Sequence, residues 1–110
     1  MKHSIDKKNG AAVAAFEGKV DLDSSPECRK VLLKNVARNI PVLVDLSAVT
    51  CTDSSGISCM VEALQNARKS GQEFALVGVR EAAMRVLSLA RLDAVFTIHE
   101  TREAGLVSLG

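Results

Sequence analysis

The chain has 110 residues, which is enough for one compact domain. Hydrophobic residues make up 47% and charged residues 25% of it, so the sequence can build a core and does not have the composition of a disordered protein. The net charge of +1 and the 3% of aromatic residues argue against a nucleic-acid-binding protein, because such proteins carry a basic patch or aromatic stacking platforms.

The sequence favours a cytoplasmic protein that does not insert into a membrane. No apolar run approaches the roughly 20 residues that span a bilayer, and residues 1–8 are polar where a secretory signal is apolar. The three cysteines, Cys28, Cys51 and Cys59, form no CxxC pair. We therefore predict no disulfide, no metal site and no redox role, but reduced thiols that pack as small apolar side chains.

The first predicted element is a β-hairpin. Asn9-Gly10 suits the two central positions of a type I′ turn. An extended stretch precedes this turn at residues 4–8, and residues 11–18 form the returning strand. We therefore predict two antiparallel strands joined by a two-residue turn.

A helix is predicted to start at Ser24 or Ser25. Ser24 and Glu27 have the spacing of a capping box, and Ser25 before a proline is an equally good start. The helix should end before Pro41, because a residue that precedes proline avoids the helical conformation. Residues 42–46 then form a short apolar strand, typical of a parallel sheet that is buried on both faces.

The remainder of the chain alternates between helices and strands. Helices are predicted at residues 55–70, 81–91 and 101–109, and strands at residues 74–79 and 95–98. Gly71 is placed to end the first of these helices. The apolar residues predicted to face inward from the last two helices are Ala83, Val86, Leu87 and Ala90, then Leu106, Val107 and Leu109. This alternation indicates an α/β fold in which right-handed connections join parallel strands.

The segment Asp53-Ser54-Ser55-Gly56 follows the strand at 42–46 after a short loop and opens a helix. Open α/β sheets bind their ligands where strand ends face helix N-termini. The side-chain oxygens of Asp53, Ser54 and Ser55 can accept hydrogen bonds from the first helical turn. Gly56 would keep that turn open to close approach by another chain. By themselves these residues favour an ordinary helix cap over a functional site.

Six segments, spread over nearly the whole chain, form a pattern when their order and spacing are taken together. They are Gly18-Lys19-Val20-Asp21, Val44-Asp45-Leu46-Ser47, Asp53-Ser54-Ser55-Gly56-Ile57, Arg68-Lys69-Ser70-Gly71, residues 74–79 and Arg85-Val86-Leu87. In this order and spacing the chain resembles the STAS domain of the bacterial anti-sigma factor antagonists. One departure is Arg91, because many members of that family have glycine there. A helix C-cap of the glycine type is therefore not expected at this position.

The resemblance implies a single domain over residues 1–110 with an α/β fold. Its small mixed sheet would combine the N-terminal antiparallel hairpin with parallel strands, and about four helices would pack mainly on one side of it. We expect a protein-binding module rather than an enzyme. No catalytic residue, cofactor, metal or nucleic-acid contact is expected, and the free protein should be a monomer.

The resemblance also implies a partner and a modification. Members of the family bind a cytosolic serine kinase that otherwise holds a sigma factor or another target. That kinase phosphorylates the first serine of the motif, which is Ser54 here, and a serine phosphatase would reset it. Asp21 matches an acidic position of the family near that site, and Asp23 lies two residues further on. The implied partner-binding residues are Asp21, Asp23, Asp53, Ser54, Ser55 and Gly56.

Phosphorylation is predicted to act on the partner rather than on the fold. A phosphate adds about −1.5 to −2 charges, which the dipole and free N–H groups of a helix N-terminus tolerate. A partner that packs over Ser54 would instead meet added bulk and an anion beside Asp53 and Asp21.

Two other functions are compatible with parts of the sequence. A serine hydrolase needs a general base beside its nucleophile, but His3 lies in the N-terminal segment and His99 after the last strand, and no Gly-x-x-x-x-Gly-Lys loop is present to bind ATP. The alternative with the same fold is an accessory subunit of a membrane transporter complex that binds the transporter's ATPase. The arginines at 80, 85 and 91 are interpreted as the solvated side of a helix.

Overall fold

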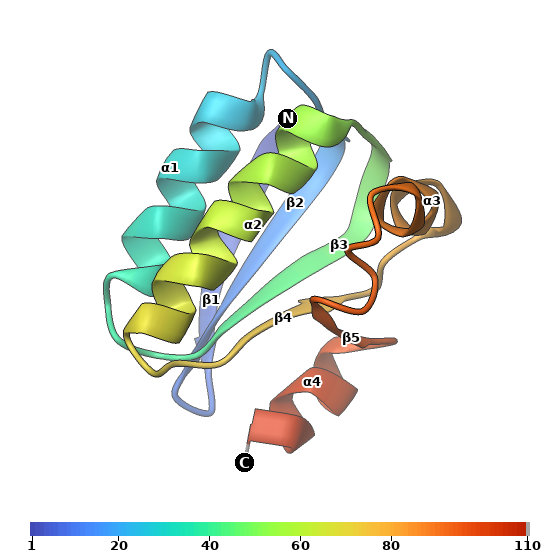
Figure 1. Cartoon of the computed structure of the whole chain (residues 1–110). Coiled ribbons are helices and arrows are strands. Elements are labelled where there is room, and N and C mark those ends of the chain that lie inside the picture. The colour runs from blue at the N-terminus through green and yellow to red at the C-terminus, as the bar shows by residue number, and fades with distance from the viewer. Residues whose placement is uncertain (110) are drawn as a thin grey trace.

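The chain folds around one five-stranded sheet (Figure 1). A computed structural model describes residues 1–109. Its strands are β1 (Lys2–Lys8), β2 (Ala11–Val20), β3 (Val42–Thr52), β4 (Phe74–Val77) and β5 (Thr97–His99). Its helices are α1 (Ser25–Val36), α2 (Ser54–Lys69), α3 (Glu81–Leu89) and α4 (Arg102–Leu109). No helix in this part of the chain is both long and apolar enough to cross a membrane.

The strands lie side by side in the order in which they occur along the chain. β1 pairs antiparallel with β2, and each later pair is parallel. The helices α1, α2 and α3 occupy the connections between the parallel strands. The predicted α/β fold with a mixed sheet and an N-terminal hairpin is therefore confirmed.

The hairpin turn has the predicted geometry. Asn9 has a φ of 52° and Gly10 a φ of 79°, so both central residues are left-handed, as a type I′ turn requires. All of β1 is exposed at the edge of the sheet, whereas β2 is largely buried.

Three helices cover one face of the sheet, and α4 covers the other (Figure 1). The larger core packs Phe16 of β2 and the strand residues of its face with Leu32 of α1, Met60 of α2 and Leu87 of α3. The smaller core contains Val13, Leu43, Ala75 and Val77, against which Leu106 of α4 packs. The prediction that the helices lie mainly on one side is confirmed.

Strand β3 is much longer than predicted. The sequence indicated a strand at 42–46 followed by a loop, but pairing with β2 continues to Thr52 through two shifts of register. The shifts fall between Ala15 and Glu17 and between Gly18 and Lys19 of β2. Bulges of this kind interrupt the alternation of buried and exposed residues, which is why the pattern did not reveal the second half of the strand.

Local predictions at helix ends are also corrected. The Ser24–Glu27 capping box does not form, because the Ser24 side chain makes no cap hydrogen bond and instead donates to the Lys19 carbonyl at 2.9 Å. Ala90 and Val107 are exposed rather than packed inward. The side chain of Leu109 lies outside the described part of the structure.

Helix α3 ends in a left-handed residue that is not glycine. Arg91 has a φ of 59°. Its N–H donates to the Ser88 carbonyl at 3.0 Å, and the Leu92 N–H donates to the Leu87 carbonyl at 2.8 Å. These two bonds are the Schellman pattern, so the expectation that no glycine-type cap forms here is wrong. Arg91 adopts this conformation at the steric cost that a Cβ carries in the left-handed region.

Ion pairing fastens α4 to the sheet. Arg102 Nε lies 2.5 Å from Oδ2 of the buried Asp45, and its Nη1 lies 3.5 Å from Asp6 Oδ2 on β1. The Ser47 N–H donates to Asp45 Oδ1 at 2.9 Å. Burial raises the pKa of Asp45, but the hydrogen bonds from Ser47 and Arg102 outweigh it and hold that pKa below its ordinary value.

Arg91→Gly should raise the free energy of unfolding by about 0.5–1 kcal/mol. The substitution relieves roughly 1–2 kcal/mol of left-handed strain in the folded state. It also increases the conformational entropy of the unfolded chain, which lowers the free energy of unfolding by roughly 0.4–1 kcal/mol. Gly71→Ala is the matched control, because Gly71 ends α2 with a φ of 72°; it should be destabilising by about 1 kcal/mol. Urea unfolding measures both, and destabilisation by Arg91→Gly would contradict the prediction.

Arg102→Met should lower the free energy of unfolding by about 2 kcal/mol near neutral pH, because the buried Asp45 carboxylate loses its cation. A carboxyl group whose pKa is lowered by folding stabilises the folded state at pH values above its pKa in the unfolded chain, which is about 3.9 for aspartate. This stabilisation is lost as the pH falls through the pKa of the folded state. The effect should therefore shrink at pH 3. Arg85→Met removes only an exposed pair with Glu81 and should cost less than about 0.5 kcal/mol. Equal losses at pH 7 and pH 3 would refute this account.

Candidate functional site

The motif predicted to carry the function forms the junction between β3 and α2. β3 ends at Thr52, Asp53 is the N-cap of α2 in an extended conformation, and Ser54 is the first helical residue. Asp53 Oδ1 accepts hydrogen bonds from the N–H groups of Ser55 at 2.9 Å and Gly56 at 3.2 Å. The carboxylate also lies at the positive end of the helix dipole. The interpretation of the motif as a helix cap is therefore confirmed for Asp53.

The other oxygen of Asp53 holds the loop between β2 and α1. Asp53 Oδ2 accepts a hydrogen bond from the Leu22 N–H at 3.2 Å. In the same loop, Asp21 Oδ1 accepts from the N–H groups of Asp23 at 3.1 Å and Ser24 at 3.2 Å. The hydrogen bond from Ser24 is the main cause that lowers the pKa of Asp21. The fold thus gathers three carboxylates at this edge, and we call Asp21, Asp23 and Asp53 the acidic rim.

Ser54 is exposed beside the acidic rim. Asp23 is also exposed, whereas Asp21, Asp53 and Ser55 are half-buried. The Ser54 side chain is therefore accessible to another protein. Its phosphorylation stays a prediction, and so does the role of its neighbours in binding a partner.

Gly56 serves the fold rather than an incoming chain. It is buried, and a Cβ placed on it would lie 2.5 Å from both the Val20 carbonyl oxygen and Thr52 Oγ1. Thr52 Oγ1 itself donates to that carbonyl at 2.9 Å. The interpretation that Gly56 leaves the turn open to another chain is therefore wrong, because the close approach is to β2 and β3 of the same chain.

The first turn of α2 has fewer free donors than the sequence analysis assumed. The N–H groups of Ser55 and Gly56 already donate to the Asp53 carboxylate, and the N–H of Ile57 donates to the Asp53 carbonyl at 3.1 Å. The expectation that these groups are available to a phosphate is therefore wrong. A phosphate on Ser54 would gain from the helix dipole but would lie near a carboxylate.

Leu22 is a surface residue that the sequence analysis missed. Its side chain is 70% exposed, and it stands between two residues of the acidic rim while Asp53 holds its backbone. Single exposed apolar residues also occur elsewhere on this surface, such as Leu89, so what distinguishes Leu22 is its place within the acidic rim. The signal in the sequence was an apolar residue flanked by two aspartates outside any helix or strand pattern.

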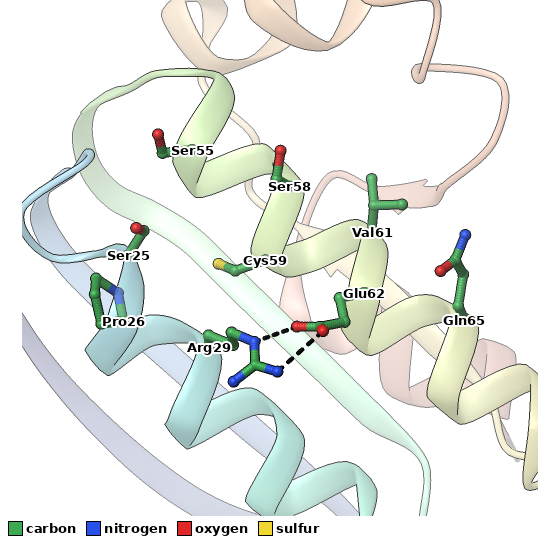
Figure 2. A pocket seen from close by; sticks show the side chains of 9 residues that line it. All are labelled: Ser25, Pro26, Arg29, Ser55, Ser58, Cys59, Val61, Glu62 and Gln65. Carbon is green, nitrogen blue, oxygen red and sulfur yellow. Dashed lines mark hydrogen bonds and ion pairs between the residues drawn. The ribbon is translucent and has the colours of Figure 1, made fainter.

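An open cavity of about 680 Å³ adjoins Ser55 between α1 and α2 (Figure 2). Arg29 of α1 and Glu62 of α2 form a two-pronged ion pair across it, with Nη2 3.1 Å from Oε1. The hydrogen bond between them lowers the pKa of Glu62 and raises that of Arg29. The guanidinium is therefore already neutralised, which makes this cavity a poor anion site. Its other lining residues are Ser25, Pro26, Ser58, Cys59, Val61 and Gln65.

The arrangement does not resemble that of a serine hydrolase. His3 on β1 lies 3.4 Å from Glu27, measured from Nδ1 to Oε1. His99 ends β5, which β4 separates from β3. Neither histidine therefore stands as a base for Ser54. Within residues 1–109, no group of three or more histidine, cysteine or acidic residues is placed to hold a metal ion.

Two of the three cysteines meet between the helices. Cys28 of α1 and Cys59 of α2 are buried with their Sγ atoms 3.1 Å apart, and the Cys59 thiol donates to the Gly56 carbonyl at 3.0 Å. All three thiols are free. The prediction that the cysteines pack as small apolar residues is confirmed for this pair and wrong for Cys51, which is exposed.

Comparison with known proteins agrees with this fold. The family model described as STAS domain matches residues 2–105. A protein of Thermotoga maritima named as a candidate anti-sigma factor antagonist is 38% identical over 60 residues, which are 54% of this chain and 53% of that protein. The match therefore spans about half the length of this curated relative.

Solved structures share the fold at lower identity. An anti-sigma factor antagonist from Mycobacterium paratuberculosis has a TM-score of 0.90 at 24% identity, over 98% of this chain and 92% of that one. The unphosphorylated form of the anti-sigma factor antagonist SpoIIAA has a TM-score of 0.81 at 12% identity, over 97% and 95% of the two chains. The phosphorylated form of SpoIIAA from Bacillus has a TM-score of 0.77 at 12% identity, over 99% and 100%.

Asp53→Ala should lower the free energy of unfolding by about 1–2 kcal/mol, because α2 loses its cap and Leu22 loses its anchor. Asp23→Ala is the matched control, since it also removes one carboxylate of the acidic rim but one that is exposed; it should change stability by less than about 0.5 kcal/mol. Urea unfolding of both variants tests this. Similar losses in the two variants would show that Asp53 has no special structural role.

Proposed function

The chain belongs to the STAS domain family, and from this premise we propose that it is an anti-sigma factor antagonist. Without phosphate it binds an anti-sigma factor that has serine kinase activity, and so frees the target that this kinase otherwise holds. Phosphorylation of Ser54 by the same kinase ends the binding, and a serine phosphatase restores it. In this role the chain binds proteins and catalyses no reaction.

The observation that carries this proposal is the exposed hydroxyl of Ser54 at a well-anchored junction. On one side of Ser54, Asp53 caps the helix, and on the other side Gly56 packs against the ends of β2 and β3. The backbone on both sides is held while the side chain stays uncovered. A kinase can therefore reach the hydroxyl without unfolding α2.

The charge of the acidic rim supports a switch that acts by repulsion. A phosphate on Ser54 would add about −1.5 to −2 charges to a surface that already carries three carboxylates. A partner that fits the neutral hydroxyl then meets both bulk and a concentrated anion. Losing about 3 kcal/mol at this contact lowers affinity by more than about 100-fold.

Leu22 supplies the apolar contact that such an interface needs. Its side chain is exposed, and its backbone is already held by Asp53. Binding a partner therefore costs little backbone conformational entropy at this residue. We place Leu22 at the centre of the proposed partner surface, together with the acidic rim, Ser54 and Ser55. Gly56 takes part indirectly, because it is buried and sets the position of the turn.

The two forms of SpoIIAA support a switch that leaves the fold in place. Both superpose on this chain over nearly its whole length. In this chain, too, the groups that hold the junction are the Asp53 carboxylate and the Gly56 contact, and neither uses the Ser54 hydroxyl. Phosphorylation should therefore change what docks rather than how the chain folds.

The decisive experiment compares binding by wild type, Ser54→Ala and Ser54→Asp. A partner captured from a lysate of the source organism on immobilised wild type is identified by mass spectrometry, purified and titrated by calorimetry. Ser54→Ala should bind like wild type, and Ser54→Asp should bind about tenfold or more weakly, because a charged, larger side chain replaces the neutral hydroxyl at the contact and loses its hydration there. Incubation with the partner and MgATP should add one phosphate to wild type and none to Ser54→Ala.

Ser58→Asp is the matched control, because Ser58 is an exposed serine one turn further along α2. It should bind within about threefold of wild type, because Ser58 lines the cavity between α1 and α2 and lies outside the proposed partner surface. Equal weakening by Ser58→Asp and Ser54→Asp would remove the special role of Ser54. Capture of a transporter ATPase instead of a serine kinase would favour the accessory-subunit alternative and overturn the proposal.

A further inference from the structure

A pair of buried thiols lies between α1 and α2, beside the cavity that adjoins Ser55. Cys28 is fully buried and Cys59 is 5% exposed. Their Sγ atoms are 3.1 Å apart, whereas the sulfurs of a disulfide are about 2.05 Å apart. A movement of about 1 Å would therefore bring them to bonding distance.

We propose that peroxide oxidises Cys59 and that Cys28 then closes a Cys28–Cys59 disulfide, which makes this thiol pair a site of reversible oxidation. The inference goes beyond the proposed function, since it concerns residues that take no part in binding through Ser54. It departs from the sequence-based prediction that the cysteines have no redox role.

The chemistry proceeds in two balanced steps. The Cys59 thiolate attacks one oxygen of hydrogen peroxide, the O–O bond breaks, and with a proton the products are a sulfenic acid and water. The Cys28 sulfur then attacks the Cys59 sulfur, the S–S bond forms and the S–O bond breaks. The departing hydroxide takes the Cys28 thiol proton and leaves as a second water. The sum is two thiols and one peroxide giving one disulfide and two waters.

Geometry assigns the first step to Cys59. Its side chain lines the open cavity, and Figure 2 shows its sulfur directed toward α1, whereas Cys28 is fully buried and is not among the lining residues. The hydrogen bond between the two thiols lowers the pKa of Cys59, and the same contact together with burial raises the pKa of Cys28. Cys59 is thus the thiol that ionises first and that a small oxidant can reach.

The third cysteine provides an internal comparison. Cys51 is exposed near the end of β3, so peroxide reaches it freely, but the described residues place no second thiol beside it. Oxidation of Cys51 should therefore stop at sulfenic or higher acids or join two chains. Oxidation of Cys59 should instead stop at an intramolecular disulfide, because Cys28 captures the sulfenic acid before a second peroxide does.

The test treats the folded, isolated protein with hydrogen peroxide, quenches it with acid, blocks the remaining thiols and maps the peptides by mass spectrometry. Cys51→Ser should lose two hydrogen atoms, about 2 Da. Both this variant and wild type should yield a Cys28–Cys59 cross-linked peptide that a dithiol reductant removes, and wild type should in addition be oxidised at the exposed Cys51. The oxidised protein should show a higher thermal midpoint, because the cross-link restricts the unfolded chain. Cys28→Ser should leave Cys59 as a sulfenic acid that dimedone traps.

Two results would overturn the inference. One is wild type in which Cys59 reaches the sulfinic acid without any cross-link. The other is a cross-link that forms only in urea, since the folded arrangement would then not promote it. Both measurements use wild type or Cys51→Ser, so they hold even if a substitution at Cys28 disturbs folding. No partner is present in the assay, so its failure leaves the binding proposal untouched.

Discussion

The surface around Ser54 depends on one carboxylate. Asp53 uses one oxygen to cap α2 and the other to hold the backbone of Leu22, so a single side chain joins the end of β3, the start of α2 and the loop after β2. Gly56 completes this junction, because only a residue without a Cβ lets the first turn of α2 rest on Val20 and Thr52. The junction satisfies the N–H groups of Ser55, Gly56 and Leu22 with one carboxylate and leaves Ser54 exposed.

This construction explains why a charge-based switch suits the site. A modification that removed a cap or broke a core contact would change the fold along with the signal. The Ser54 hydroxyl lies outside both, so a phosphate there adds charge to the surface without removing a hydrogen bond that holds α2. The carboxylates of Asp21 and Asp53 already place negative charge near Ser54, and a phosphate would add to it.

The interface between α1 and α2 combines two kinds of contact. Toward solvent, Arg29 and Glu62 neutralise each other across the open cavity. Beneath them, Cys28 and Cys59 bring two sulfurs together among aliphatic neighbours. The two cysteines belong to different helices and lie far apart in the sequence. Their spacing along the chain therefore gives no sign that their sulfurs meet.

The sequence by itself determined the parts of the structure that arise from local physics. Asn9-Gly10 specified the hairpin turn, the apolar periods specified the helices, and Asp53 specified where α2 starts. It also singled out Ser54 through the resemblance to a known family. These features depend on backbone preferences and on side chains a few residues apart, which one stretch of chain contains.

Only the tertiary structure decided what depends on contact between distant segments. Two bulges against β2 carried β3 on to Thr52, the approach of β2 turned Gly56 from an open position into a packed one, and helix packing brought Cys28 to Cys59. A burial pattern read along one strand or helix contains no information about which other segment will lie against it. Residues joined only by packing can therefore be recognised only once the sheet and its helices are assembled.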